Sequence, residues 1–215
     1  PDIRYNNKPN IAEVFKMKRL RDQSVVNLPA PRLAGKMSLE ETLNCRKSIR
    51  DFAPEPLTIE EMSQLLWAVQ GATRNGEGRT TPSAGALYPL EVYVVLQEGV
   101  FHYSPGEHSL SRRSEQDLRE PLSIAALEQN FIQEAPAVFV IAAVYERSAE
   151  NYGPRADRYA KMEAGHACQN LLLQAVSLGL GAVPVGAFQD RIVRKTLQFP
   201  LHHEPLYLIP AGRKP

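Results

Sequence analysis

The stretch AGHACQNLLLQAVSLGLGAVPVGAF, residues 164–188, is the most apolar part of the chain and indicates the class of fold. Polar residues and a proline interrupt it, which is not typical of a membrane span: His166, Gln169, Asn170, Gln174 and Pro184. Its apolar residues recur every three or four positions, which predicts a long helix over residues 157–179 with a wide apolar stripe. Such a helix lies at the centre of a fold or in a subunit interface.

Strands are predicted on both sides of this helix in the sequence. Residues 90–97 (LEVYVVLQ) predict one, and residues 137–145 (AVFVIAAVY) form an apolar run that is typical of a strand covered on both faces. The remaining elements are a hairpin over 101–112, one or two short helices over 115–130, a strand over 181–188, a helix near 189–197 and a last strand over 204–212. Strands and helices mix without strict alternation, so the predicted class is α+β.

Two capping boxes mark helix starts nearer the amino terminus. In each, a Ser or Thr is followed three residues later by Glu, first at Ser38 and Glu41 and then at Thr58 and Glu61. The first box predicts a helix to about residue 45. The second predicts a longer helix that Gly71 stops.

The domain organisation follows from these signals. Residues 1–37, which include the proline-punctuated LPAPRLAG, are expected to form an arm that wraps over another part of the structure. Residues 38–215 are expected to form a single domain. Within it, residues 72–86 are rich in Gly, Thr, Ser and Pro and predict a long loop of the kind that often has a function. Whether a segment before Pro1 was removed stays open.

Composition excludes several classes of protein. The chain has 215 residues and a formal net charge of +1, which argues against a dedicated nucleic-acid protein. The five histidines form no HxxxH or HxH pair, so no metal site is predicted. Cys45 and Cys168 form no CxxC motif, so we expect reduced cysteines and a cytoplasmic protein. Neither near-match to the dinucleotide fingerprint GxGxxG is complete, so a Rossmann site is not predicted either.

Two segments have the residue types of an anion site. CRKSIRDF, residues 45–52, places Arg46, Lys47 and Arg50 within five positions and adds the hydroxyl of Ser48. Arginine binds phosphate bidentately, although a solvated charged face is the alternative. The carboxyl end, PAGRKP, adds Arg213 beside an apolar strand, although a basic tail often has no partner.

Two further segments offer small residues to a flat ligand. The loop TPSAGALYP, residues 81–89, lets backbone approach a ligand closely, and a plain surface turn is the alternative. GAVPVGAF, residues 181–188, exposes backbone N–H groups between small side chains. In the helix before it, His166 and Cys168 are expected to be core residues.

Together these four segments, in this order, resemble the nitroreductase-like FMN oxidoreductase family. The resemblance runs from about residue 38 to the end, and PSAGALYP with GHACQN is most similar to the branch of azoline (thiazole- or oxazole-forming) dehydrogenases. It implies an α+β fold with a central, mostly antiparallel sheet flanked by helices. It also implies a homodimer of the domain-swapped type, with FMN at the interface and contacted by both chains.

The resemblance also implies the site residues. The FMN phosphate and ribityl chain would be bound by Arg46, Lys47, Ser48 and Arg213, with Arg50 as a further candidate that could instead pair with a carboxylate. Pro82, Ser83 and Ala84 of the partner chain would line the isoalloxazine ring, and Gln70 would reach its polar edge or the ribityl hydroxyls. Val185 and Gly186 would present backbone N–H groups to the reactive flavin nitrogen.

The azoline branch also has a Lys-Tyr pair before the long helix that removes a proton from the substrate. Here the corresponding residues are Asn151 and Tyr152, and asparagine cannot be that base. Tyr152 is therefore a candidate proton donor or a packing residue.

The function implied is ping-pong hydride transfer from NADH or NADPH through FMN to a small electron-poor acceptor. The alternatives are an azoline dehydrogenase of peptide maturation, a flavin-binding protein without turnover, and an anion-binding module that does not use flavin.

Overall fold

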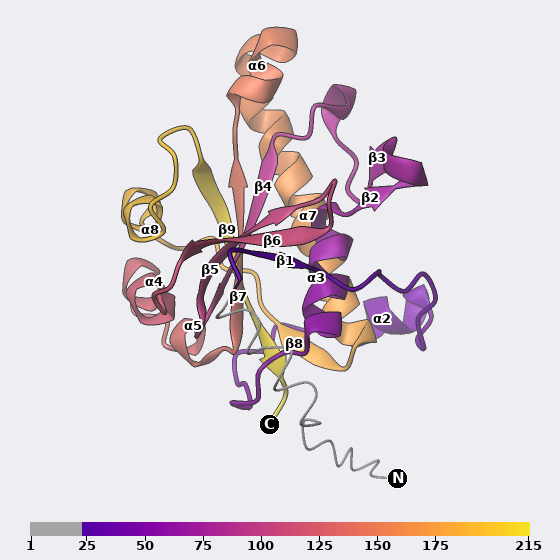
Figure 1. The fold of residues 1–215 in the computed structure, drawn as a ribbon, viewed down its shortest axis with the longest axis vertical. Coiled ribbons are helices and arrows are strands. Elements are labelled where there is room, and N and C mark those ends of the chain that lie inside the picture. The colour runs from indigo at the N-terminus through magenta and orange to yellow at the C-terminus, as the bar shows by residue number, and fades with distance from the viewer. Residues whose placement is uncertain (1–22) are drawn as a thin grey trace.

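A seven-stranded sheet with helices on both faces forms the body of the computed structural model, which describes residues 23–215 (Figure 1). The strands are β1 (Val25–Asn27), β4 (Leu90–Leu96), β5 (Gly99–Ser104), β6 (Ser109–Ser114), β7 (Ala137–Ala143), β8 (Leu180–Ala182) and β9 (Glu204–Arg213). Their order is β1-β6-β5-β4-β7-β9-β8, and each neighbouring pair is antiparallel. The predicted α+β class with a mostly antiparallel sheet is confirmed.

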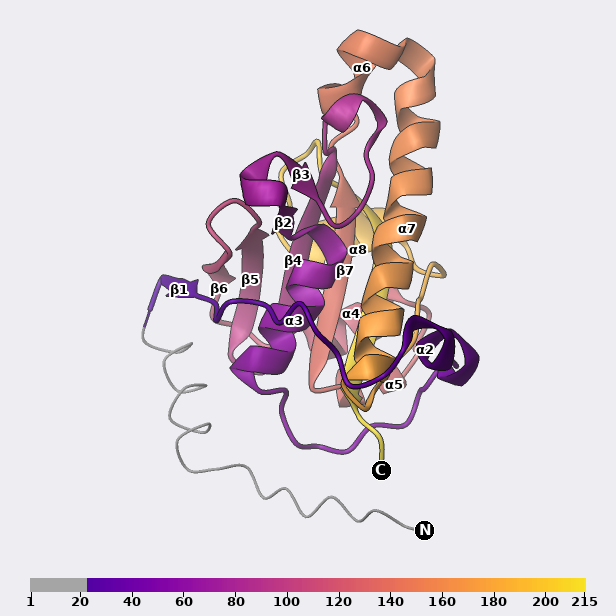
Figure 2. The same cartoon turned by 90° about the vertical axis from the view of Figure 1, so that its right-hand side faces the viewer.

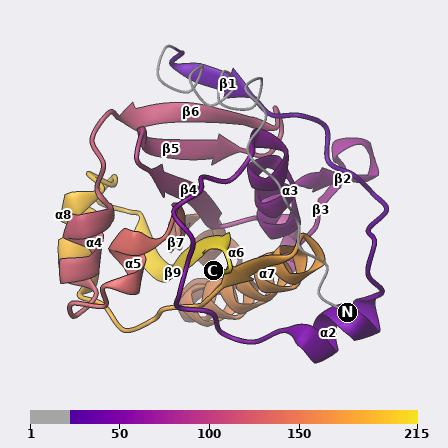
Figure 3. The same cartoon turned by 90° about the horizontal axis from the view of Figure 1, so that it is seen from below.

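The helices form the two outer layers. They are α2 (Leu39–Cys45), α3 (Ile59–Gln70), α4 (Arg119–Ala125), α5 (Phe131–Glu134), α6 (Glu146–Tyr152), α7 (Ala156–Ser177) and α8 (Asp190–Thr196). Seen from below, α3 and α7 cover one face of the sheet, and α4, α5 and α8 lie on the other side (Figure 3). The long helix α7 runs beside α3 (Figure 2). This arrangement explains why β7, an interior strand of the sheet, is apolar without interruption. Phe139 and Ile141 pack towards α3 and α7, whereas Val138 and Val140 pack towards the opposite layer.

Both capping boxes are present. Ser38 Oγ accepts from the Glu41 N–H at 3.1 Å, and the Glu41 carboxylate accepts from the Ser38 N–H at 2.8 Å. Thr58 and Glu61 repeat this pattern at 3.1 and 2.7 Å. Two backbone donors at each helix start are thereby satisfied by residues three positions apart in the sequence.

Some expectations need correction. The strand β8 covers Leu180–Ala182, so only the first two residues of the predicted strand over 181–188 form a regular strand. Val185 then makes an isolated bridge to Leu208, because Pro184 has no N–H to donate. Cys168 is buried as expected, but His166 is exposed because it lies on the outward side of α7.

The predicted arm lies partly outside the described residues, which begin at residue 23. Within the described part, β1 pairs with β6 at the edge of the sheet and buries Val26. A strand of three residues has too little pattern to be recognised without its partner strand.

The long loop contains short elements of its own. β2 (Ala72–Thr73) and β3 (Gly78–Arg79) pair with each other around a 3₁₀ turn, and a second 3₁₀ turn covers Ala84–Ala86. The loop then leads directly into β4.

Candidate functional site

The basic segment, residues 46–50 (RKSIR), lies beside β8 at the edge of the sheet. Ser48 forms a parallel β-bridge with Ala182, and the Ile49 N–H donates to the Ala182 carbonyl at 3.1 Å. A Cβ on Gly181 would lie 2.6 Å from Ile49 Cγ2, so only glycine allows this close approach. The backbone of the basic segment is thus fixed to the sheet while most of its side chains stay exposed.

The carboxyl end of β9 lies directly beside the residues that follow the basic segment. The Ala53 N–H donates to the Arg213 carbonyl at 3.0 Å. A Cβ on Gly212 would lie 2.6 Å from Pro136 Cδ and 3.2 Å from Phe52 Cδ1, so glycine again permits the contact. The structure therefore places together CRKSIRDF and PAGRKP, which are more than 150 residues apart in the sequence (the end marked C in Figure 1).

The basic side chains at this place have different partners. Arg213 donates to both carboxylate oxygens of Glu61, at 2.8 and 3.0 Å, so it is oriented by the first turn of α3. The Arg50 guanidinium lies 5.8 Å from the centroid of the Phe131 ring, a cation–π contact. Within residues 23–215, Arg46 and Lys47 form no ion pair. Both cations are therefore available to an anion.

Backbone N–H groups of the VPVGAF segment lie at the same edge of the sheet. The Val185 N–H already donates to the Leu208 carbonyl at 2.8 Å. Gly186 is exposed, and its N–H has no hydrogen-bond partner in the described part of the chain. A Cβ on Gly186 would meet nothing within 4 Å. Of the two expected donors, only Gly186 has its N–H free.

An internal hydrogen bond and a contact with Tyr152 hold the loop that contains Pro82, Ser83 and Ala84. Ser83 Oγ accepts from the Tyr88 N–H at 2.9 Å, which closes the turn. Gly85 has φ +61°, and a Cβ there would lie 2.8 Å from the Tyr152 hydroxyl oxygen. The Tyr152 side chain is therefore in contact with this loop.

Gln70 is connected to the same loop through Glu163, which hydrogen-bonds to both Gln70 and Ser83. It is fully buried, and its Nε2 donates to Glu163 Oε1 at 3.4 Å, whereas its Oε1 has no partner among the described residues. Burial raises the pKa of Glu163, and hydrogen bonds from Ser83 and Gln70 partly oppose this. Sequence reasoning missed Glu163. A charged residue within the apolar stripe of Ala160, Ala164 and Ala167 was the signal that could have found it.

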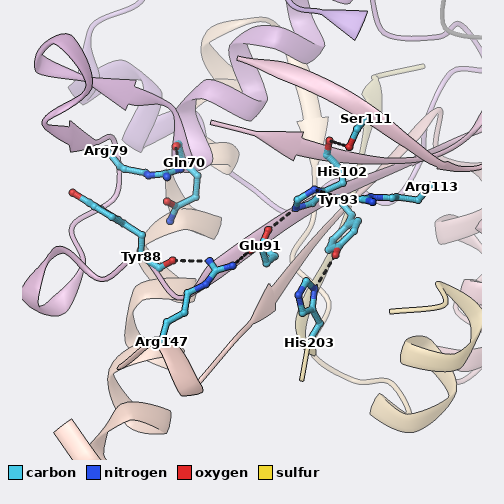
Figure 4. A network of polar contacts seen from close by, with 10 residues as sticks. All are labelled: Gln70, Arg79, Tyr88, Glu91, Tyr93, His102, Ser111, Arg113, Arg147 and His203. Carbon is cyan, nitrogen blue, oxygen red and sulfur yellow. Dashed lines mark hydrogen bonds and ion pairs between the residues drawn. The ribbon is translucent and has the colours of Figure 1, made fainter. Parts of the chain in front are cut away.

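A second group that sequence reasoning missed surrounds Glu91 (Figure 4). Its carboxylate pairs with Arg147 and with the His102 ring, and Arg147 Nη1 also donates to the Tyr88 carbonyl at 3.1 Å. Burial raises the pKa of Glu91, but these hydrogen bonds outweigh it and lower the pKa to about 2. Arg79 donates to the Gln70 carbonyl at 3.3 Å and lies 5.0 Å from the centroid of the Tyr88 ring. The loop is therefore held by two arginines as well.

The expected site residues form two groups within the chain. Leu90, directly after the loop, pairs with Ala143, which also pairs with Glu204 at the start of β9. The basic segment lies instead at Arg213, where β9 ends. At roughly 3.3 Å per residue, the two ends of β9 are about 30 Å apart. One chain therefore brings together Arg46, Lys47, Ser48, Arg50 and Arg213, and separately Gln70, Pro82, Ser83, Ala84 and Tyr152.

Residues 23–215 contain neither a metal site nor a membrane-spanning helix. No group of three or more His, Cys, Asp or Glu side chains there could hold a metal ion. No helix in that range is long and apolar enough to cross a membrane.

The antiparallel sheet, its two helical layers and the cationic edge beside β8 define an α+β protein with a surface suited to an anionic ligand. The chain belongs to the Nitroreductase family, whose pattern it matches over residues 43–213. It is therefore a nitroreductase-family oxidoreductase, and the family predicted from the four segments is confirmed.

Known relatives agree with this assignment. The chain is 46% identical over 184 residues to MJ1384 of Methanocaldococcus jannaschii, a protein named as a nitroreductase, with 83% of this chain and 92% of that one covered. It is 31% identical over 153 residues to the microcin B17-processing protein McbC of Escherichia coli, covering 65% of this chain and 55% of McbC. It is 24% identical over 186 residues to an FMN reductase (NADPH) of Bacillus subtilis, covering 80% of this chain and 64% of the relative.

A solved structure supports the same family assignment. The crystal structure of a nitroreductase-type protein from Ralstonia eutropha superposes with a TM-score of 0.83 at 34% identity, covering 90% of each chain.

Proposed function

We propose that this chain is an FMN-dependent oxidoreductase that transfers a hydride from NADH or NADPH to a small electron-poor acceptor. One observation carries the proposal. The basic segment is fixed beside the end of β9, so that two unpaired cations, a hydroxyl and the placed guanidinium of Arg213 lie at one edge of the sheet. Similarity to an FMN reductase supports FMN as the anion.

The residues at this edge fit FMN chemically. Arg46 and Lys47 would bind its phosphate, with Ser48 as a further donor and Arg213 already oriented by Glu61. The Gly186 N–H would donate to the reactive ring nitrogen, because Gly186 is exposed and its N–H has no hydrogen-bond partner in residues 23–215. FMN, when bound, supplies the two-electron chemistry, and the protein orients and stabilises its charged forms.

The loop residues would come from a second copy of the chain. Within one chain, Pro82, Ser83 and Ala84 lie near one end of β9 and the basic segment lies at the other. The phosphate end of FMN is therefore placed far from the loop of the same chain, and we propose that a ring near Gly186 meets the loop of the partner in a homodimer. A flavin-loaded protein that sediments as a single 24.0 kDa chain would contradict this arrangement.

Gln70 and Tyr152 receive modified roles in this proposal. The Gln70 amide is buried against Glu163, so it would support the loop under the ring without direct contact with the ribityl chain. Tyr152 lies against Gly85, so its hydroxyl would stand beside the ring-lining residues, where it could donate a proton to an acceptor.

The first test is a visible absorption spectrum of the purified protein after addition of FMN and then NADPH without oxygen. Binding should shift the flavin band, and NADPH should bleach it. A bound flavin that NADH and NADPH both leave oxidised would refute hydride transfer from a nicotinamide and favour storage or binding of flavin. Failure to bind FMN at all would favour an anion-binding module.

Substitution of Arg46 tests the phosphate contact. Arg46→Ala should raise the dissociation constant for FMN by about 10- to 150-fold, because a charge-assisted hydrogen bond contributes roughly 1.5–3 kcal/mol. The measurement is quenching of FMN fluorescence on titration. Arg191→Ala, at an exposed arginine of α8, is the matched control and should leave the constant unchanged. Equal constants for the Arg46 variant and the parent would remove Arg46 from the site.

The similarity to McbC supports a second candidate function, the oxidation of azolines in a modified peptide. Asn151 argues against it, because the position next to Tyr152 lacks the basic lysine of that branch. The discriminating assay offers a thiazoline substrate to the FMN-loaded protein. Turnover by the parent would establish this second function, whereas turnover only after Asn151→Lys would assign the missing activity to the missing base.

A further inference from the structure

A cavity of about 390 Å³ lies between strands β4, β5 and β6 and the segment that joins α8 to β9. It shares no residue with the basic segment, with Gly186 or with the loop of residues 81–89. Its apolar walls come from Leu118, Leu197 and Phe199, and the Tyr93 ring lies 4.2 Å from the Phe199 ring. A cavity of this size and lining suits a small ligand with an apolar body.

Two polar groups of the cavity, His203 and Tyr93, contact each other. His203 is 6% exposed, and its Nδ1 lies 2.8 Å from the Tyr93 hydroxyl. Burial lowers the pKa of His203 to about 4 and raises the pKa of Tyr93, so both groups are neutral. With Tyr93 as the donor to Nδ1, the ring proton of His203 lies on Nε2, which has no hydrogen-bond partner in the described part of the chain.

The charge of the cavity is positive. Glu91 is ionised, but Arg147 pairs with it, and the His102 Nε2–H donates to it. His102 must have that tautomer, because its Nδ1 accepts from Arg113 Nη2 at 3.2 Å and a guanidinium can only donate. Arg113 has no carboxylate partner within residues 23–215. Its remaining N–H groups are free for an anion.

We propose that this cavity binds a small organic monocarboxylate with an aromatic or branched apolar body. The carboxylate contacts Arg113 and the His203 ring N–H, and the apolar body lies against Phe199, Leu118 and Leu197. A carboxylate matches the fork of a guanidinium, and Arg113, which is exposed at the rim of the cavity, has no carboxylate partner of its own in residues 23–215.

The position of the cavity also connects it to the loop. A chain of contacts runs from Arg113 to His102, then to Glu91 and Arg147, and ends at the Tyr88 carbonyl (Figure 4). An occupant bound to Arg113 is therefore at one end of a network whose other end holds the proposed flavin loop.

The test uses benzoate as the probe on FMN-saturated protein that contains ¹³C-labelled histidine. Ring signals are assigned by single His→Gln substitutions. Benzoate in the millimolar range should shift the signals of His102 and His203 in a saturable way and leave His108 and His166 unchanged. Benzylamine, which has the same ring and the opposite charge, should cause no such shift.

Variants of Arg113 test whether this side chain binds the carboxylate. Arg113→Gln should weaken benzoate binding at least about tenfold, whereas Arg113→Lys should retain most of it and Arg191→Gln should have no effect. Circular dichroism confirms that each variant is folded. Two results would overturn the proposal: shifts confined to the flavin spectrum with His102 and His203 unaffected, or equal binding of benzoate by the parent and Arg113→Gln. Neither result depends on whether the protein reduces FMN with NADPH.

Discussion

A Phe139→Ala variant is expected to lose about 3–5 kcal/mol of the free energy of unfolding, the usual cost of removing a large aromatic side chain from a core. Phe139 is completely buried in β7, an interior strand of the sheet, where it packs with Val92, Val94 and Ile209 in the cluster under α3 and α7. The layers on both sides of β7 prevent the structure from collapsing into the space left behind.

Urea unfolding followed by circular dichroism measures this change, with FMN held at one concentration because bound ligand adds stability of its own. Phe188→Ala is the matched control. Phe188 is only partly buried at the margin of the opposite cluster, so its loss should cost less than half as much. Similar losses for the two variants would mean that β7 does not form the central core of the sheet.

A Glu91→Gln variant is expected to lose about 3 kcal/mol at neutral pH, because a tenfold change in proton affinity corresponds to about 1.36 kcal/mol. The folded pKa of Glu91 is about 2, below its ordinary value of 4.5, because hydrogen bonds from His102 and Arg147 overcome the opposing effect of burial. The unfolded chain therefore binds more protons between these two values. The stability that Glu91 contributes is complete above about pH 5 and is lost as the pH falls towards 2.

The check is the free energy of unfolding of both proteins between pH 7 and pH 3. The parent should lose stability faster than Glu91→Gln as the pH falls, so the difference between them should shrink. Glu115→Gln is the control, because that carboxylate is 83% exposed where it pairs with Arg112 and should contribute well under 1 kcal/mol. A difference that stays constant with pH would show that the ionised form of Glu91 is not the stabilising one.

Sequence reasoning could recognise features whose determinants lie close together in the chain. The capping boxes at Ser38 and Thr58 depend on residues three positions apart, and both are confirmed with both of their hydrogen bonds. The strand β7 follows from an uninterrupted apolar run, and the helix α7 follows from apolar periodicity. The family follows from four segments that are informative only when they occur together and in this order. It is confirmed over residues 43–213.

Which of these segments meet depends on the tertiary fold. Only the order β4-β7-β9-β8 brings the basic segment to Arg213 and leaves the loop at the far end of β9. The pairs Arg213–Glu61 and Gln70–Glu163 join residues 152 and 93 positions apart. Such pairs depend on how two helical layers pack on one sheet, and no local period encodes that packing. Local patterns therefore predicted the longer elements and the family, whereas the short strands and the partners of each charged side chain depended on the packing of the whole domain.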